Sequence, residues 1–232
     1  MEFTLREAWT NVVLAEDYEL HMANVGQAEA NAELVRNAIL DLPLNQGARL
    51  LFAGAGPGQM FDYLDGAFLA LFEVVFTDIN PAFLTRISER AIAAGLVNVS
   101  TQVDDVEDPK IKGPFDLAIL VLVLEHVDWK KALSRLSQLP AQAFLLVTQK
   151  NPPEIQSNVS PNRVLPGSLA LASMGEKPHL IDACELGDFM TDLRFRLRSS
   201  ETRLVADGKE MMALTFDRIR SKPEIEHPRA TL

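Results

Sequence analysis

The feature that most constrains the fold is a glycine-rich turn that follows a short apolar run. Residues 49–58 read Arg-Leu-Leu-Phe-Ala-Gly-Ala-Gly-Pro-Gly, and twenty residues after Gly58 a second apolar run ends in the carboxylate of Asp78. Glycines let a backbone pass close to a ligand, and a carboxylate at the end of the next strand can accept hydrogen bonds from ribose hydroxyls. The pair predicts a nucleoside pocket in an α/β protein.

Apolar runs alternate with helical patterns in the middle of the chain. The predicted strands are 49–53, 74–77, 99–103, 115–122 and 143–148, and the predicted helices are 59–72, 80–95 and 128–139. A regular β-α alternation implies a doubly wound parallel sheet. The near-continuous apolar run 115–122 is typical of a central strand that is covered on both faces.

The two ends of the chain depart from this alternation. Residues 5–42 look helical with a break near residues 24–26, and 184–193 is a further predicted helix. Asp207-Gly208 between two strand-like runs predicts a β-hairpin. Residues 151–181 contain five prolines without clear periodicity, which is typical of a lid or binding loop.

We therefore expect one domain over residues 1–232. Its predicted parts are an N-terminal helical cap (1–45), a cofactor-binding core (49–149), a lid loop (151–181), and a C-terminal helix and hairpin (182–220).

Charge and composition exclude several classes of partner. The net charge is −10, so a nucleic-acid backbone would be repelled. Cys184 is the lone cysteine, which excludes an internal disulfide and fits a reducing compartment, and no Cys/His spacing predicts a metal site. The longest apolar stretch, 117–124, is far too short to span a membrane, and the first residues lack a signal-peptide layout. We expect a soluble cytoplasmic protein.

The glycine spacing discriminates between nucleoside cofactors. Gly54-x-Gly56-x-Gly58 differs from the Gly-x-Gly-x-x-Gly of dinucleotide-binding domains, which disfavours a nicotinamide-dependent oxidoreductase. Asp78 could instead cap the following helix, but Asn80-Pro81 suits that position better.

On these motifs the chain resembles, over residues 10–220, the class I S-adenosylmethionine-dependent methyltransferases of the small-molecule type. The resemblance implies a mostly parallel, seven-stranded Rossmann-like sheet, with a C-terminal antiparallel hairpin and with N-terminal helices over the site. It also implies S-adenosyl-L-methionine as cofactor and a small-molecule methyl acceptor. The implied cofactor-binding residues are Gly54, Ala55, Gly56, Gly58, Asp78, Ile79, Asp105, Val106 and Val121.

Within that set, the resemblance places Asp105 next to the adenine amino group and Val106 against the ring. Asp104 is the alternative if the alignment slips by one residue. The neighbouring Glu107 and Asp108 are interpreted as a solvated acidic loop.

Candidate catalytic residues follow the fourth predicted strand. Glu125 and His126 interrupt an apolar run at the carboxyl end of that strand, where open α/β sheets place ligands. A general base helps when the acceptor is a hydroxyl, and His126 or His179 could serve; each could equally be a residue without such a role. Tyr18 and His21, three apart on an N-terminal helix, could touch the cofactor or the substrate, or simply belong to the core or surface.

Phe52 departs from the family pattern. The matching position usually carries an acidic residue that supports the amino group of the cofactor, and a phenyl ring cannot accept that hydrogen bond. Another carboxylate could substitute, the cofactor could bind more weakly, or turnover could be lost. The second functional hypothesis is therefore a protein of this fold that binds the cofactor or a partner without catalysis.

Overall fold

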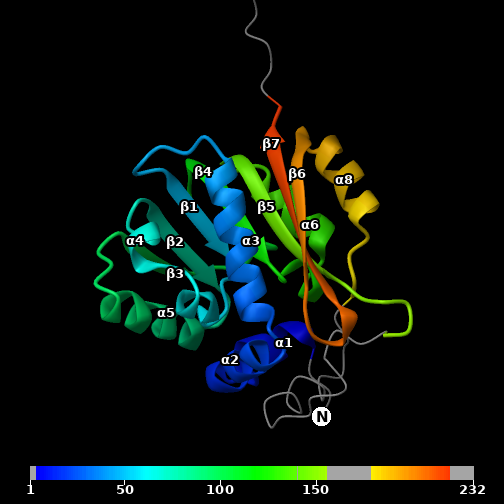
Figure 1. Cartoon of the computed structure of the whole chain (residues 1–232). Helices are drawn as coiled ribbons and strands as arrows, with labels where there is room; N and C mark the ends of the chain where they lie inside the picture. The colour runs from blue at the N-terminus through cyan, green and yellow to red at the C-terminus, as the bar shows by residue number, and fades with distance from the viewer. Residues whose placement is uncertain (1–3, 140, 156–178, 220–232) are drawn as a thin grey trace, which may run out of the picture.

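A mixed sheet organises the residues that the computed structural model describes, which are 4–139, 141–155 and 179–219. Its strand order is β3-β2-β1-β4-β5-β7-β6 (Figure 1). The strands are β1 (Arg49–Ala53), β2 (Glu73–Asp78), β3 (Val99–Val103), β4 (Phe115–Val121), β5 (Ala141–Lys150), β6 (Phe195–Leu204) and β7 (Glu210–Arg218). Strands β1 to β5 are parallel, and β7 is antiparallel to both β5 and β6. The predicted doubly wound sheet with a C-terminal hairpin is confirmed.

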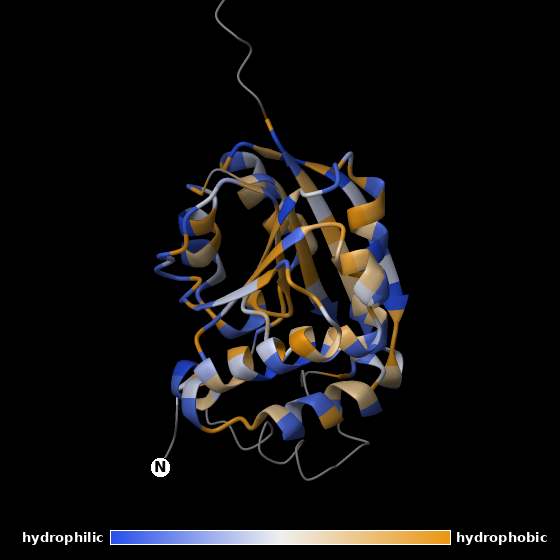
Figure 2. Cartoon of the chain, turned by 90° about the vertical axis from the view of Figure 1, so that its left-hand side faces the viewer, coloured by the Kyte–Doolittle hydropathy of each residue, from blue (hydrophilic) through white to orange (hydrophobic). Residues whose placement is uncertain are grey.

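Helices cover both faces of this sheet because its strands alternate their apolar side chains between two cores. Leu50 and Phe52 pack in the core beneath α3 (Gln27–Asp41) and α5 (Pro81–Ala93). Leu51 and Ala53 pack in the opposite core, beneath α6 (Trp129–Leu136) and α8 (Ala183–Asp192). Figure 2 shows that the strands between these helices are largely apolar. A period of two residues along β1 therefore divides the protein into two cores.

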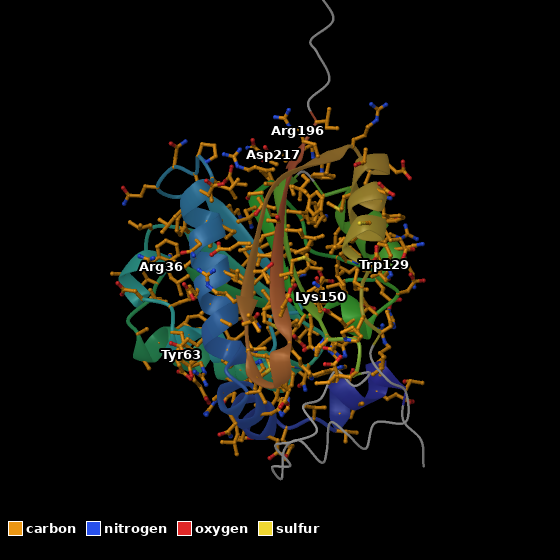
Figure 3. The ribbon with its side chains drawn as sticks, turned by 45° about the vertical axis from the view of Figure 1, so that its right-hand side comes forward. Arg36, Tyr63, Trp129, Lys150, Arg196 and Asp217 are labelled. Atoms are coloured by element: carbon orange, nitrogen blue, oxygen red, sulfur yellow. The ribbon has the colours of Figure 1, made fainter. Side chains whose placement is uncertain are left out.

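Aromatic contacts join neighbouring helices on each face (Figure 3). Arg36 of α3 lies over the ring of Phe68 in α4 (Gly66–Leu69), at 5.7 Å from its centroid. On the other face, Trp129 of α6 meets Phe189 of α8 edge to face, with ring centroids 5.2 Å apart.

Among the described residues, no helix is both long and apolar enough to cross a bilayer.

The N-terminal region forms three helices, α1 (Leu5–Asn11), α2 (Ala15–Asn24) and α3. The predicted break near residues 24–26 is confirmed, and Gly26 adopts a left-handed φ of 73° there. A second break, at residues 12–14, was not expected. It folds α1 and α2 over the carboxyl ends of the strands, so the predicted N-terminal cover is confirmed.

The helix predicted over residues 59–72 is wrong. The chain instead forms a short 3₁₀ turn, η1 (Gln59–Asp62), followed by the single turn of α4. Asp65 explains the interruption, because its side chain accepts a hydrogen bond from the Ala67 N–H and begins a new helix there. The other predicted elements are present, with ends that differ by at most three residues.

The division into a cap, a core and a C-terminal part stays a prediction. Most of the predicted lid loop, residues 156–178, lies outside the described residues.

Gly58 allows the glycine turn to pack against α5. Its φ of 77° is left-handed, and a Cβ at this position would lie 2.8 Å from Cγ1 of Ile87 and 3.1 Å from the Phe61 ring. Only glycine satisfies both the backbone conformation and the close approach.

We predict that Gly58→Ala destabilises the fold more than Gly95→Ala does. Gly95 is also left-handed, at 68°, but a Cβ there would meet nothing within 4 Å. Both variants carry backbone strain, and only Gly58→Ala adds a clash, so its free energy of unfolding should fall by roughly 1–3 kcal/mol more. Urea denaturation measures the difference; equal losses would show that the turn does not pack against α5 as described.

Candidate active site

A pocket opens at the carboxyl ends of β1, β2 and β4, where the strand order reverses direction. Open α/β sheets bind ligands at this switch point. The empty volume is about 790 Å³, including open solvent at the mouth. Of the residues predicted for the site, the structure places the following around this pocket: Tyr18, Gly54, Ala55, Gly56, Asp78, Ile79, Asp105, Val106, Val121 and His126.

Asp78 is the polar centre of the pocket. Its Oδ2 accepts a hydrogen bond from the Gly56 N–H and its Oδ1 accepts one from the Asn80 N–H, each at 2.8 Å. Burial raises the pKa of Asp78, while these backbone hydrogen bonds lower it. A carboxylate has about four acceptor positions, so capacity remains for a ligand hydroxyl.

Asn80 connects Asp78 to the N-terminal helices. Its Oδ1 caps α5 by accepting from the Ala82 N–H, as its position in the sequence predicts. Its Nδ2 donates to the carbonyl of Trp9 in α1 at 2.9 Å. The residue that starts α5 therefore also positions the cover of the pocket.

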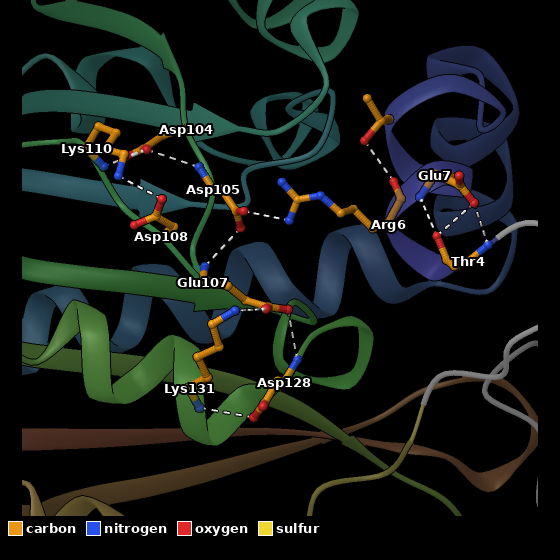
Figure 4. Close-up of polar contacts among 11 residues, drawn as sticks. Thr4, Arg6, Glu7, Asp104, Asp105, Glu107, Asp108, Lys110, Asp128 and Lys131 are labelled. Atoms are coloured by element: carbon orange, nitrogen blue, oxygen red, sulfur yellow. Dashed lines mark hydrogen bonds and ion pairs between the residues drawn. The ribbon is translucent and has the colours of Figure 1, made fainter.

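The acidic loop after β3 uses its two adjacent aspartates differently (Figure 4). Asp104 turns into the loop, where its carboxylate accepts from the backbone N–H groups of Lys110 and Ile111. Asp105 faces α1 across the pocket and accepts from Arg6 at 2.6 Å. The Arg6 side chain is 58% exposed, and such a pair adds little to stability, so a ligand can compete for Asp105.

Glu107 belongs to the pocket as well, which corrects its interpretation as part of a solvated acidic loop. It lines the pocket and forms an ion pair with Lys131 at 3.0 Å. Asp108, in contrast, is exposed as expected and pairs with Lys110.

An aromatic cluster covers the pocket. Trp9 of α1 contacts Tyr18 of α2 at 5.2 Å and His126 at 4.8 Å, both edge to face. Phe83 of α5 stacks on Tyr18 at 6.5 Å. Trp9, Phe83 and Arg6 are not predicted from the sequence, because single aromatic or polar residues on helices carry no signal for a distant site. Gln59 is not predicted either, although it directly follows the glycine turn, because a single glutamine there forms no recognisable motif.

His126 and Glu125 have different environments although they are adjacent in the turn η2 (Leu124–His126). His126 lines the pocket, and burial, followed by the charge of His179, lowers its pKa to about 4. Its imidazole is therefore neutral at neutral pH. Glu125 is only 2% exposed and does not line the pocket; its Oε1 accepts from the Gln149 N–H at 2.8 Å.

Four other residues of interest also lie outside the pocket lining. Gly58 packs against α5. Burial and the charge of Lys209 lower the pKa of His21, a buried residue of α2, to about 4. His179 is exposed, and its N–H donates to the carbonyl of Glu125. Phe52 lies in the core and stacks on Phe76 at 4.9 Å.

The central part of the chain matches a known family model. Residues 51–142 match the family model described as methyltransferase domain. Together with the fold, the match confirms the predicted resemblance to class I S-adenosylmethionine-dependent methyltransferases. No curated protein sequence matches the chain.

Solved structures of the same fold come from diverse proteins. Magnesium protoporphyrin IX methyltransferase from Synechocystis PCC 6803, with bound SAH, is 16% identical, with 81% of this chain and 82% of that chain covered and a TM-score of 0.60. A putative sarcosine dimethylglycine methyltransferase from Galdieria sulphuraria is 12% identical, with coverages of 83% and 85% and a TM-score of 0.62. The cyclase SpnF is 14% identical, with 82% of both chains covered and a TM-score of 0.61. At these identities the likeness establishes the fold.

We predict that Glu125 makes stability fall as pH rises. Burial raises its pKa from 4.5 to about 7, and its Oε2 has no hydrogen-bond partner among the described residues. Because the folded state holds this proton more tightly than the unfolded state, its stabilising effect is full below pH 4.5 and is lost as pH rises towards 7.

Glu125→Gln removes this dependence with little change in shape. Between pH 4.5 and 8, the free energy of unfolding of the wild-type protein should fall relative to that of the variant by roughly 3 kcal/mol. Taking the difference cancels the opposite trend from His21 and His126, whose pKa values are lowered. Parallel stability curves for the two proteins would contradict the raised pKa.

Proposed function

We propose that the protein transfers a methyl group from S-adenosylmethionine to a small organic acceptor. The observation that carries the proposal is Asp78, whose carboxylate holds the glycine turn at Gly56 and faces the pocket at the switch point of the sheet. We assign the ribose hydroxyls to Asp78, and the adenine to the space bounded by Ile79, Asp105 and Val106.

The glycine turn suits a ligand that approaches the backbone closely. A Cβ on Gly54 would lie 2.7 Å from Cγ2 of Val123, so this position leaves no room for a side chain. Gly56 has a φ of 61°, and its nearest neighbours are Tyr18 and Gln59, each 3.4 Å from the Cβ position. These features support a cradle in which the backbone of the turn contacts the cofactor.

The bound cofactor supplies a methyl group on a positively charged sulfur. For an in-line displacement, the protein has to align the acceptor and keep water out. Trp9 and Phe83 form an apolar cover that supports water exclusion, and Val127 adds apolar lining beside His126. This lining and the net charge of −10 favour a small, neutral or cationic acceptor.

His126 is the base that we propose for a hydroxyl acceptor. Its Nδ1 is buried without a hydrogen-bond partner among the described residues, and the neutral ring can take up a proton. A pKa of about 4 makes it a weak base. Such a base suits an acceptor whose proton becomes acidic as the bond to the methyl carbon forms.

A second function, cofactor binding without methyl transfer, is favoured by Phe52. This residue provides no acceptor at the position where the family usually has an acid. The likeness to SpnF, which is described as a cyclase, fits the general rule that a fold does not fix a reaction. We expect binding under both hypotheses and transfer only under the first.

We predict that Asp78→Asn weakens the binding of S-adenosylhomocysteine roughly 10- to 100-fold, because hydrogen bonds from the ribose to a charged acceptor are lost. The amide oxygen can still accept one of the two backbone hydrogen bonds but the amide nitrogen cannot accept the other, so urea denaturation of the variant checks that it remains folded. Isothermal titration calorimetry measures the dissociation constant. Asp108→Asn, at an exposed side chain of the neighbouring loop, is the matched control and should bind as the wild type does.

Titration with S-adenosylmethionine, S-adenosylhomocysteine and NAD distinguishes methyl transfer from cofactor binding without transfer. Binding of S-adenosylmethionine and S-adenosylhomocysteine, with methyl transfer to a member of a diverse acceptor panel, supports the proposal. Binding without transfer to any acceptor favours the second function. Binding of NAD, with no binding of either sulfur nucleoside at millimolar concentration, would refute both.

A further inference from the structure

The amino-acid end of the proposed cofactor needs an acceptor that Phe52 does not supply. The Phe52 side chain is 2% exposed and stacks on Phe76 in the core beneath α3 and α5. An ammonium group buried in a pocket is costly unless it is hydrogen-bonded. Another residue of the pocket therefore has to accept from it if the cofactor is bound as proposed.

The carboxylates of the pocket are already engaged. Asp78 accepts from two backbone N–H groups at the ribose position. Asp105 pairs with Arg6, and Glu107 pairs with Lys131, both on the adenine side of the pocket. Asp104 binds the backbone of its own loop.

Gln59 offers a buried acceptor that is not already engaged by another group of the described residues. Its side chain lines the pocket, the residue is only 7% exposed, and its Oε1 is buried without a hydrogen-bond partner among the described residues. A buried amide oxygen without a partner is unusual in a folded protein, which points to a ligand that completes it.

Two neighbours position the Gln59 amide. It follows the glycine turn directly, and its Oε1 lies 3.4 Å from the Cβ position of Gly56, on the cradle side of the pocket. A hydrogen bond from its side chain also reaches the Tyr18 hydroxyl in α2. An amide that donates to Tyr18 through nitrogen leaves its oxygen for a second donor.

We propose that Gln59 replaces the missing acid and binds the amino group of the cofactor, with Tyr18 orienting the amide. Gln59 is then a binding residue of this chain for the amino-acid end, separate from the ribose contact at Asp78. The inference rests on the proposed function, because it assumes a cofactor that has an amino-acid end.

The test compares two nucleosides that differ at that end. S-adenosylhomocysteine carries the amino acid, and 5′-methylthioadenosine lacks it but keeps the adenine, the ribose and the sulfur. Gln59→Met, similar in length and without a polar acceptor, should weaken S-adenosylhomocysteine roughly 10- to 100-fold and leave 5′-methylthioadenosine unchanged. Gln46→Met, at an exposed position, is the control and should affect neither ligand.

Two further variants keep the test decisive if Gln59→Met does not fold. Gln59→Glu retains an acceptor, so it should keep the binding of S-adenosylhomocysteine. Tyr18→Phe removes the orienting hydroxyl and should weaken that ligand alone, by less than Gln59→Met does. Unchanged binding of S-adenosylhomocysteine by Gln59→Met, or an equal loss for both nucleosides, would overturn the inference. If the wild-type protein binds neither nucleoside, the proposed function itself fails.

Discussion

The structure of the site depends on the two hydrogen bonds that the Asp78 carboxylate accepts. One holds the glycine turn after β1, and the other holds the start of α5 at Asn80. Asn80 in turn binds the carbonyl of Trp9, so the same chain of contacts reaches the N-terminal cover. Asp78, at the end of β2, therefore positions the glycine turn directly and the N-terminal cover through Asn80. Its carboxylate still has acceptor positions for a ligand.

The two-residue period of β1 explains how the chain tolerates Phe52. The Phe52 ring points to the same face of the sheet as Leu50, and it packs in a core that also contains Phe76. An aromatic residue here improves packing but removes an acceptor beside the glycine turn. On the other side of that turn, the side-chain oxygen of Gln59 has no hydrogen-bond partner among the described residues, and it is the alternative acceptor that we propose. If Gln59 binds the cofactor as proposed, Phe52 contributes to packing and Gln59 to ligand binding, at two different positions.

The sequence predicted the elements whose signals are local. The buried strands and the α5 cap at Asn80 were predicted because apolar runs and capping residues act within a few positions. Asp65 was missed as a helix start, since its preference competes with the apolar pattern around it. Trp9 and Arg6 reach the pocket through contacts of α1 with distant residues, and no local pattern encodes those. Glu125 is a catalytic candidate from its position after β4, but the sequence does not show that its side chain is buried away from the pocket.

The charges around the pocket bear on how the proposed cofactor and its product would exchange. Four carboxylates, from Asp78, Asp104, Asp105 and Glu107, and one cation, Arg6, line the pocket among the described residues. Such a lining attracts a positively charged sulfonium more than the neutral thioether that remains after transfer. Neutral His126 does not repel that charge. The field would therefore stabilise the cofactor before transfer more than the product after it, which favours product exchange.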